Sequence, residues 1–246
     1  WTTPAMRSTI WSMQAQFAAA KIGKYATSES GDTLEMVERP SGGLSFVLVD
    51  GQRSGKSAKA ISNIVARKAI SLLADGVRDG AVARAASDYL YTHRAGKVMA
   101  TLNILSVDLL SQTLVIVRNN HAPVILIRDN EIQEIDDPVE PVGIRKAIRP
   151  SIHEYPLSEG LAAVVYTDGL MYAGERKGQR MDVNRCVRDL HKAGQPNPQE
   201  WASHLLSQAL QLDEGRPGDD ISVLVMCILP DDKNDVRYLY ARMPLK

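Results

Sequence analysis

The sequence predicts a single α+β domain in which two pairs of helices pack against mainly antiparallel sheet. Strand-like runs follow one another along the chain, and helical segments come in pairs instead of alternating with single strands. The length supports this prediction, because 246 residues can bury a sizeable core. At roughly 100–200 residues per domain, this length fits one domain, or at most two.

The composition argues against several classes of protein. With 29 Lys+Arg against 29 Asp+Glu, the net charge is zero and gives no case for a nucleic acid or a membrane as the main partner. Cys186 and Cys227 lie far apart, which excludes a disulfide framework or a structural zinc site and fits a reducing cytosol. The N-terminal residues lack a basic region followed by an apolar stretch, so we expect no signal peptide there, and no apolar run reaches the ~18 residues that a membrane span needs. We therefore expect a soluble cytoplasmic protein.

The first half of the chain predicts strands followed by a pair of helices. Residues 9–24 are ambiguous, because their alanines favour a helix while the alternation near residue 13 favours a strand. Strands at 33–38 and 44–49, joined by a short turn, predict an antiparallel hairpin. Apolar residues at helical spacing predict helices at 57–74 and about 81–93.

The second half predicts more strands and a second pair of helices. Four strand-like runs at a spacing of about ten residues predict an antiparallel meander: 98–107, 113–118, 123–127 and 131–135. A buried strand at 161–167 precedes helices at about 183–193 and directly after Asn197, which is a helix N-cap followed by proline. A late strand spans 221–228, and residues 236–242 could form one more.

Aspartates stand at the ends of several predicted strands. Asp50 and Asp168 each end a buried strand and are followed by glycine, Asp219 and Asp220 precede the late strand, and Asp32 precedes the strand at residue 33. If these strand ends meet, the clustered negative charge is tolerable only when a cation neutralises it. Oxygen ligands without His or Cys suit Mg²⁺ or Mn²⁺.

Two other interpretations compete with a metal site. Asp-Gly is first of all a turn dipeptide, and we expect the copies at 75–76 and 79–80 to be turns between helices. The segment 51–57 resembles a phosphate-binding P-loop, but that loop needs a glycine where Asp50 stands, and it belongs to parallel sheets. Arg53 and Lys56 could face a substrate phosphate, although exposed basic residues are more often only solvated.

Six short motifs follow one another along the chain: Ser30-Gly31-Asp32, 46–56 (FVLVDGQRSGK), 99–102 (MATL), 118–123 (RNNHAP), 165–170 (VYTDGL) and 218–222 (GDDIS). Their order resembles the bacterial SpoIIE-like branch of the metal-dependent serine/threonine protein phosphatases. Each motif is weak alone, but together they span about residues 12–230. The family motif usually has a glycine before the histidine of the fourth segment, and here His121 directly follows two asparagines. We expect this histidine to pack and hydrogen-bond within its turn rather than to catalyse.

The resemblance implies a four-layer α-β-β-α sandwich of two mainly antiparallel sheets flanked by helical pairs, with a metal site at one end. It implies two ions of Mn²⁺ or Mg²⁺, with a third left open. Asp50 would bridge both metals, with the Gly51 carbonyl on one of them. Asp168 and Asp219 would complete the first shell, and Asp32 would lie beside the site as a direct or water-mediated ligand.

The resemblance also sorts the remaining candidates. It favours Asp219 over Asp220 as the ligand, since the second position usually holds a supporting group, and we keep Asp220 as the alternative. Asp50, Asp168 and Asp219 would be the catalytic set, because they would hold the ions that activate a water for attack on phosphorus. We expect one phosphatase domain over residues 1–246, with its core at about 12–230 and a C-terminal extension at 231–246.

The predicted function is hydrolysis of phosphoserine or phosphothreonine on a regulatory partner protein. The resemblance implies a phosphorylated anti-sigma-factor antagonist or a stressosome component as that partner. The chain looks more like the short, stand-alone, RsbX-like members than like the members fused to a sensor domain. The resemblance also suggests that the helical pair at 57–93 acts as a switch. Two alternatives remain open: a P-loop-like nucleotide hydrolase, and a catalytically silent scaffold that binds a partner without turnover.

Overall fold

Two five-stranded sheets form the centre of the protein in the computed structural model, which describes residues 13–231 and 236–244. The first sheet has the order β1 (Met13–Ile22), β10 (Ile221–Pro230), β9 (Ala162–Tyr166), β6 (Val124–Arg128) and β7 (Glu131–Ile135). The second has the order β2 (Thr33–Glu38), β3 (Gly43–Gly51), β4 (Ala100–Asp108), β5 (Thr113–Asn119) and β8 (Ser151–Pro156). Every pairing in both sheets is antiparallel.

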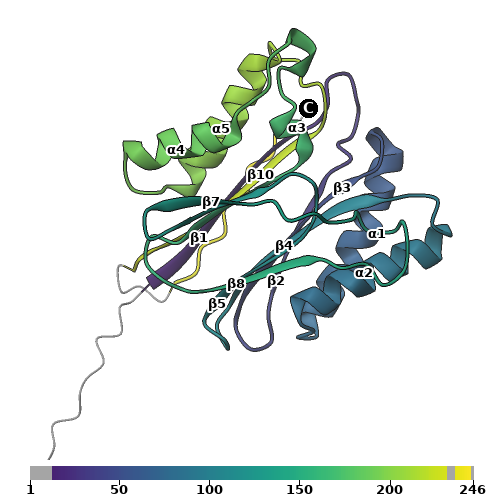
Figure 1. Ribbon diagram of the computed structural model, residues 1–246, viewed down its shortest axis with the longest axis horizontal. Coiled ribbons are helices and arrows are strands. Elements are labelled where there is room, and N and C mark those ends of the chain that lie inside the picture. Colours follow the sequence, from purple (N-terminus) through teal and green to yellow (C-terminus); the bar gives the residue numbers. More distant parts are fainter. Residues whose placement is uncertain (1–12, 232–235, 245–246) are drawn as a thin grey trace, which may run out of the picture.

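Helices cover the outer face of each sheet, as Figure 1 shows. Helices α1 (Gly55–Ala74) and α2 (Asp79–Arg94) pack on the second sheet, whereas α4 (Val183–Ala193) and α5 (Pro198–Leu212) pack on the first. Three clusters of buried apolar residues fill the two helix–sheet interfaces and the space between the sheets. This arrangement is the four-layer sandwich expected from the sequence, with α1 and α2 each beginning two residues before the predicted position.

The ambiguous N-terminal segment is a strand within the described residues. Residues 13–22 pair with all ten residues of β10, while residues 9–12 lie outside the described part of the chain. The rings of Phe17 and Phe46 stack with centroids 4.4 Å apart and join the two sheets at this edge. Because this pairing and packing satisfy both the backbone and the apolar side chains, they outweigh the helix propensity of the alanines.

The predicted meander is wrong in its pairing, although its four strands exist. Strands β4 and β5 pair with each other in the second sheet, and β6 and β7 pair with each other in the first. The missing partner of β5 is β8, which the sequence did not indicate. The chain therefore crosses from one sheet to the other between β5 and β6, over residues 120–123. The spacing of strands along the sequence predicts hairpins well, but it does not indicate which sheet a hairpin joins.

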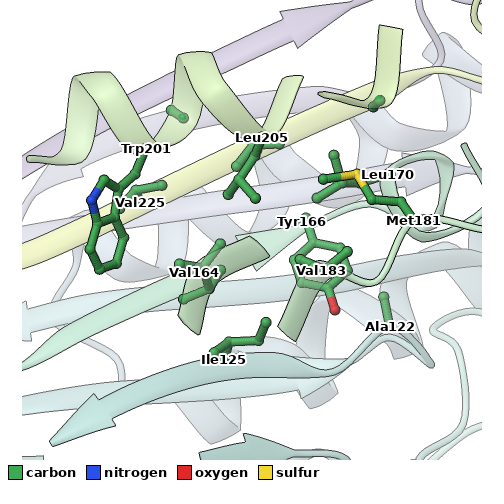
Figure 2. Packing of buried hydrophobic residues seen from close by; sticks show 14 of the residues in the cluster. Ala122, Ile125, Val164, Tyr166, Leu170, Met181, Val183, Trp201, Leu205 and Val225 are labelled. Carbon is green, nitrogen blue, oxygen red and sulfur yellow. The ribbon is translucent and has the colours of Figure 1, made fainter. Parts of the chain in front are cut away.

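Helix α5 seals the outer core of the first sheet. Its N-cap is Asn197, as predicted, and the Asn197 side chain accepts hydrogen bonds from two backbone amides in the first turn of the helix. Trp201 and Leu205 are buried and point toward Val164 and Val225 of the strands (Figure 2). Trp201 is thus a core residue, and its truncation would cost about 3–5 kcal/mol in the free energy of unfolding.

Three further points complete the fold. Short helices α3 (Asp168–Met171) and η1 (Glu175–Lys177), which the sequence did not predict, follow β9. Residues 236–242 form no strand, so that prediction is wrong. Among the described residues, no helix is long and apolar enough to cross a membrane.

Candidate metal centre

The antiparallel pairing brings the four predicted strand ends to one end of the sandwich. Thr33 pairs with Val49, so Asp32 at the start of β2 lies beside Asp50 at the end of β3. In the first sheet, Tyr166 pairs with Val223, which places the beginning of α3 next to the loop that precedes β10. Each sheet therefore contributes acidic residues from two neighbouring strand ends.

Asp32 links the two sheets at this end. Its side chain is fully buried, and its Oδ2 accepts hydrogen bonds from Thr167 Oγ1 at 3.0 Å and Ser222 Oγ at 2.6 Å. Both donors belong to the first sheet's strand ends, whereas Asp32 leads into the second sheet. The other oxygen, Oδ1, is buried without a hydrogen-bond partner among the described residues. An orphaned carboxylate oxygen of this kind is costly unless a cation or proton satisfies it.

The pKa values of these acids are raised by burial and by one another's negative charge. Burial, followed by the negative charges of Asp32, Asp168 and Asp219, raises the pKa of Asp50 to about 9. Burial is also the main cause that raises the pKa of Asp32 to about 6, against the hydrogen bond from Ser222. Burial raises the pKa of Asp168 as well. Carboxyl groups that resist ionisation together form a site in which a bound cation would be stabilising.

The two neighbouring acids before β10 have different environments. Both oxygens of Asp220 are used, because Oδ1 accepts from the backbone amide of Lys24 at 2.9 Å and Oδ2 from that of Gly31 at 2.8 Å. Asp220 is buried, whereas the Asp219 side chain is half exposed and its Oδ1 lies 3.9 Å from Lys24 Nζ. Asp220 therefore fixes the backbone that leads to Asp32, and Asp219 is the better candidate ligand.

The glycines after Asp50 and Asp168 are required for space rather than for a turn. A Cβ on Gly51 would lie 2.0 Å from the carbonyl oxygen of Ala58, and one on Gly169 would lie 2.1 Å from that of Asp220. Neither glycine has a positive φ. Helix α1 and the loop before β10 can approach the acids this closely because no side chain intervenes.

Two lysines that sequence reasoning missed converge beside the acids. Lys21 from β1 and Lys59 from α1 both donate to the backbone carbonyl of Asp32, and Lys59 also donates to Thr33 Oγ1 at 3.0 Å. Burial is the main cause that lowers the pKa of Lys21. No motif marks these lysines, because their role depends on which elements meet in space.

The turn between β5 and β6 presents His121 to the site. Its neighbours Asn120 and Ala122 are buried, and Asn120 donates to the Tyr166 carbonyl while accepting from the Ala122 amide. Rather than packing within the turn, the His121 side chain is half exposed, and its Nε2 lies 3.5 Å from Asp168 Oδ2. The turn therefore holds a histidine against one of the candidate ligands.

The donor set fits a hard divalent cation in charge and in ligand type. The candidates are carboxylates with one adjacent backbone carbonyl, and the buried Asp32 oxygen has no partner of its own. Such oxygen donors favour Mg²⁺ or Mn²⁺ over softer metals. Across residues 13–231 and 236–244, however, no group of three or more acidic, His or Cys side chains is drawn together as a complete ligand set. The site is an open cluster that a cation would have to draw together.

Comparison with known proteins identifies the family of this chain. The chain belongs to the stage II sporulation protein E (SpoIIE) family, whose model matches residues 40–229. The curated stage II sporulation protein E of Bacillus subtilis (strain 168) is 21% identical over 217 residues, which cover 88% of this chain. The match spans 26% of the length of that relative, so the chain corresponds to about a quarter of it.

Solved structures agree on the fold. The PP2C phosphatase domain of SpoIIE from Bacillus subtilis, solved with a fragment of its regulatory domain, has a TM-score of 0.74 at 20% identity, covering 87% of this chain and 63% of that one. RsbX in complex with magnesium has a TM-score of 0.65 at 16% identity, with coverages of 87% and 95%. The catalytic domain of the phosphatase PstP with two manganese ions has a TM-score of 0.66 at 16% identity, with coverages of 89% and 100%.

Proposed function

We propose that this protein is a metal-dependent phosphatase that hydrolyses phosphoserine or phosphothreonine on a partner protein. The observation that carries the proposal is the cluster around Asp50, where burial and then three other carboxylates raise the pKa of Asp50, and where one buried oxygen of Asp32 has no hydrogen-bond partner among the described residues. Membership of the SpoIIE family and the PP2C fold of the solved neighbours support the same reading. The antiparallel neighbours of β3 argue against the P-loop alternative.

Some residues of the chain would hold the metal ions, and others would orient the ligands. Asp50, the Gly51 carbonyl, Asp168 and Asp219 would hold one or two Mn²⁺ or Mg²⁺ ions, with Asp32 as a direct or water-mediated ligand. Thr167 and Ser222 fix the Asp32 carboxylate, so its free oxygen has a defined direction. Bound cations of this kind supply a water of lowered pKa and offset negative charge on a phosphoryl group.

A phosphorylated regulatory protein is the substrate class that we infer. The family resemblance suggests an anti-sigma-factor antagonist or a stressosome-type protein. The Asp219 side chain is half exposed, so this part of the site is accessible to a macromolecular substrate. We place the reaction in the cytoplasm, where such partners occur.

The test is hydrolysis of p-nitrophenyl phosphate with and without Mn²⁺, comparing wild type with Asp50→Ala and Asp168→Ala. We expect turnover that requires Mn²⁺ and is lost in both variants, while Asp189→Ala, on the exposed side of α4, retains it. Calorimetric Mn²⁺ titration of all four proteins accompanies the assay. A wild type that neither turns over substrate nor binds Mn²⁺ through these aspartates would be a scaffold, and nucleotide binding without phosphatase activity would restore the P-loop alternative.

A further inference from the structure

Positive charge is concentrated in one part of this neutral chain. Residues 51–99, which contain α1 and α2, carry nine Lys+Arg against three Asp+Glu, whereas the whole chain carries 29 of each. Four of these cations, Arg53, Lys56, Arg94 and Lys97, are exposed and lie near the ends of elements. We call these four residues the basic rim.

The basic rim lies at the metal-site end of the second sheet. Arg53 and Lys56 follow Asp50 directly, at the beginning of α1. Helix α2 begins at the opposite end of the sheet, where Asp79 contacts Arg39, and it packs along α1, so its last residue, Arg94, returns toward the beginning of α1.

Backbone contacts join the two halves of the rim. The amide of Gln52 donates to the Met99 carbonyl at 3.1 Å, the Met99 amide contacts Gln52 Oε1 at 3.3 Å, and Ala100 pairs with Gly51. The loop that carries Lys97 is therefore a direct neighbour of the loop that carries Arg53. The basic residues form one edge of the candidate centre rather than a scattered set.

The two edges of the site differ in how their cations are used. On the edge formed by the first sheet, Lys177 pairs with Glu214 at 3.0 Å, Arg180 pairs with Glu175, and Lys24 lies 3.9 Å from Asp219. Two arginines of this edge form no ion pair but have other partners, because Arg176 donates to the Gly218 carbonyl and Arg216 lies over the Tyr25 ring. Among the described residues, no side chain of the basic rim forms an ion pair. Its positive charge is therefore available to a molecule that approaches the site.

We propose that the basic rim docks an acidic protein surface around the phosphorylated residue of the substrate. This inference rests on the proposed phosphatase function. A phosphoserine carries a charge of about −1.5 to −2, which the carboxylates of the centre repel until cations are bound. A row of unpaired cations beside the centre would offset that repulsion, speed association and select phosphoproteins with acidic flanks. A nucleic acid fits less well, because its continuous negative charge would also run across the carboxylates of the opposite edge.

Peptide binding tests this docking surface directly. Two phosphoserine peptides, one flanked by glutamates and one by lysines, are assayed for hydrolysis. Their fluorescein-labelled, non-hydrolysable phosphonate analogues are titrated with protein and Mn²⁺ at low and at high salt. The rim variant combines Lys56→Glu, Arg94→Glu and Lys97→Glu. The matched control combines Arg185→Glu, Arg188→Glu and Lys192→Glu on α4, which makes the same change in net charge on the opposite face of the sandwich. A labelled single-stranded oligonucleotide is titrated in parallel.

We expect wild type and the α4 control to prefer the glutamate-flanked peptide by about tenfold at low salt, as is typical of several rim charges acting together, and salt to weaken the preference. The rim variant should lose or invert this preference. Equal binding of both peptides by wild type, an equal loss in the α4 control, or tighter binding of the oligonucleotide than of the acidic peptide would each overturn the proposal. If binding follows the rim but no protein hydrolyses either peptide or p-nitrophenyl phosphate, the docking surface stands and the proposed phosphatase function fails.

Discussion

The two ends of the second sheet handle buried aspartates in opposite ways. At the end away from the candidate centre, Arg39 Nη1 lies 3.0 Å from Asp79 Oδ2, and Arg39 Nη2 lies 3.5 Å from Asp108 Oδ2. Ser45 and Ser106 complete this network with further hydrogen bonds. At the other end, no arginine among the described residues forms an ion pair with the acids around Asp50. Lys21 and Lys59 donate to the backbone carbonyl of Asp32 instead, and Lys24 lies 3.9 Å from the half-exposed Asp219.

This difference fits a structural role for one end and the proposed metal site at the other. An aspartate paired with a buried arginine is satisfied without help, and removing one partner is strongly destabilising. Carboxylates that share a buried site without a counter-charge lower stability until a cation or a proton arrives. The same residue type thus has a structural role at one end and a proposed functional role at the other.

The largest expected effect is on activity. Asp50→Asn should lower Mn²⁺-dependent turnover about a thousandfold or more, because it removes the central carboxylate of the proposed centre. The metal-free variant should be at least as stable as wild type, since a pKa of about 9 already keeps Asp50 protonated at neutral pH. Turnover of p-nitrophenyl phosphate and urea unfolding in EDTA measure the two effects. A large loss of stability in EDTA would contradict the contrast between the two ends.

The next effect is on stability. Arg39→Met should lower the free energy of unfolding by about 3–5 kcal/mol, because it leaves the buried Asp79 carboxylate without its partner. Urea unfolding measures the loss, and adding Asp79→Asn in the same chain should restore part of it. Mn²⁺ affinity of the folded variant should match that of wild type. A changed affinity would mean that the two ends are coupled through the sheet.

The pH dependence of the metal-free protein sharpens the comparison. Because the pKa values of Asp32 and Asp50 are raised to about 6 and about 9, the folded state holds more protons than the unfolded state above about pH 4. Unfolding free energy should therefore fall as pH rises from about 4 to about 9. Thermal unfolding in EDTA from pH 5 to pH 9 measures this slope, and Asp50→Asn should flatten it above about pH 6. An unchanged slope in that variant would contradict the assignment of this pH dependence to Asp50.

The affinity for Mn²⁺ should rise with pH, whereas the stability of the metal-free protein should fall. If Mn²⁺ displaces one proton from the carboxyl cluster, its apparent affinity should rise about tenfold per pH unit below the pKa of Asp50. Calorimetry in buffers of different ionisation enthalpy counts the released protons. Binding without proton release at pH 7 would show that Mn²⁺ binds away from Asp50.

The smallest expected effect concerns the support of Asp32. Ser222→Ala removes the 2.6 Å hydrogen bond to Asp32 Oδ2 and should weaken Mn²⁺ binding about tenfold. Ser207→Ala, on the exposed side of α5, is the control and should leave binding unchanged. Calorimetric titration measures both variants. Equal affinities for all three proteins would show that Thr167 alone is sufficient to orient Asp32.

Much of this architecture could be predicted from the sequence, for reasons that are local. Alternation and helical spacing depend on neighbouring residues, and they located most of the strands and the two helical pairs correctly. The acids at strand ends were also visible, and the structure brings Asp32, Asp50, Asp168 and Asp219 to one end.

What the sequence did not predict depends on contacts between distant segments. Sheet membership of β6 is decided by pairing with β9, far along the chain. Asp79, expected in a simple turn, begins α2 and is buried against Arg39, which no spacing rule connects to it. The separate environments of Asp219 and Asp220 follow from backbone amides of the segment 24–31, which lies nearly 200 residues earlier in the chain.

The pairing of β1 with β10 has a consequence for how the protein is made. Ile22 pairs with Ile221, so β1 has no sheet partner until nearly 200 further residues have been translated. At about 5–20 residues per second, this delay is on the order of 10–40 s. During that time an apolar strand edge is open to wrong partners, which makes early chaperone binding or fast refolding valuable. Asp219 also emerges last among the four acids, so no nascent chain can assemble the full cluster before the final strand is in place.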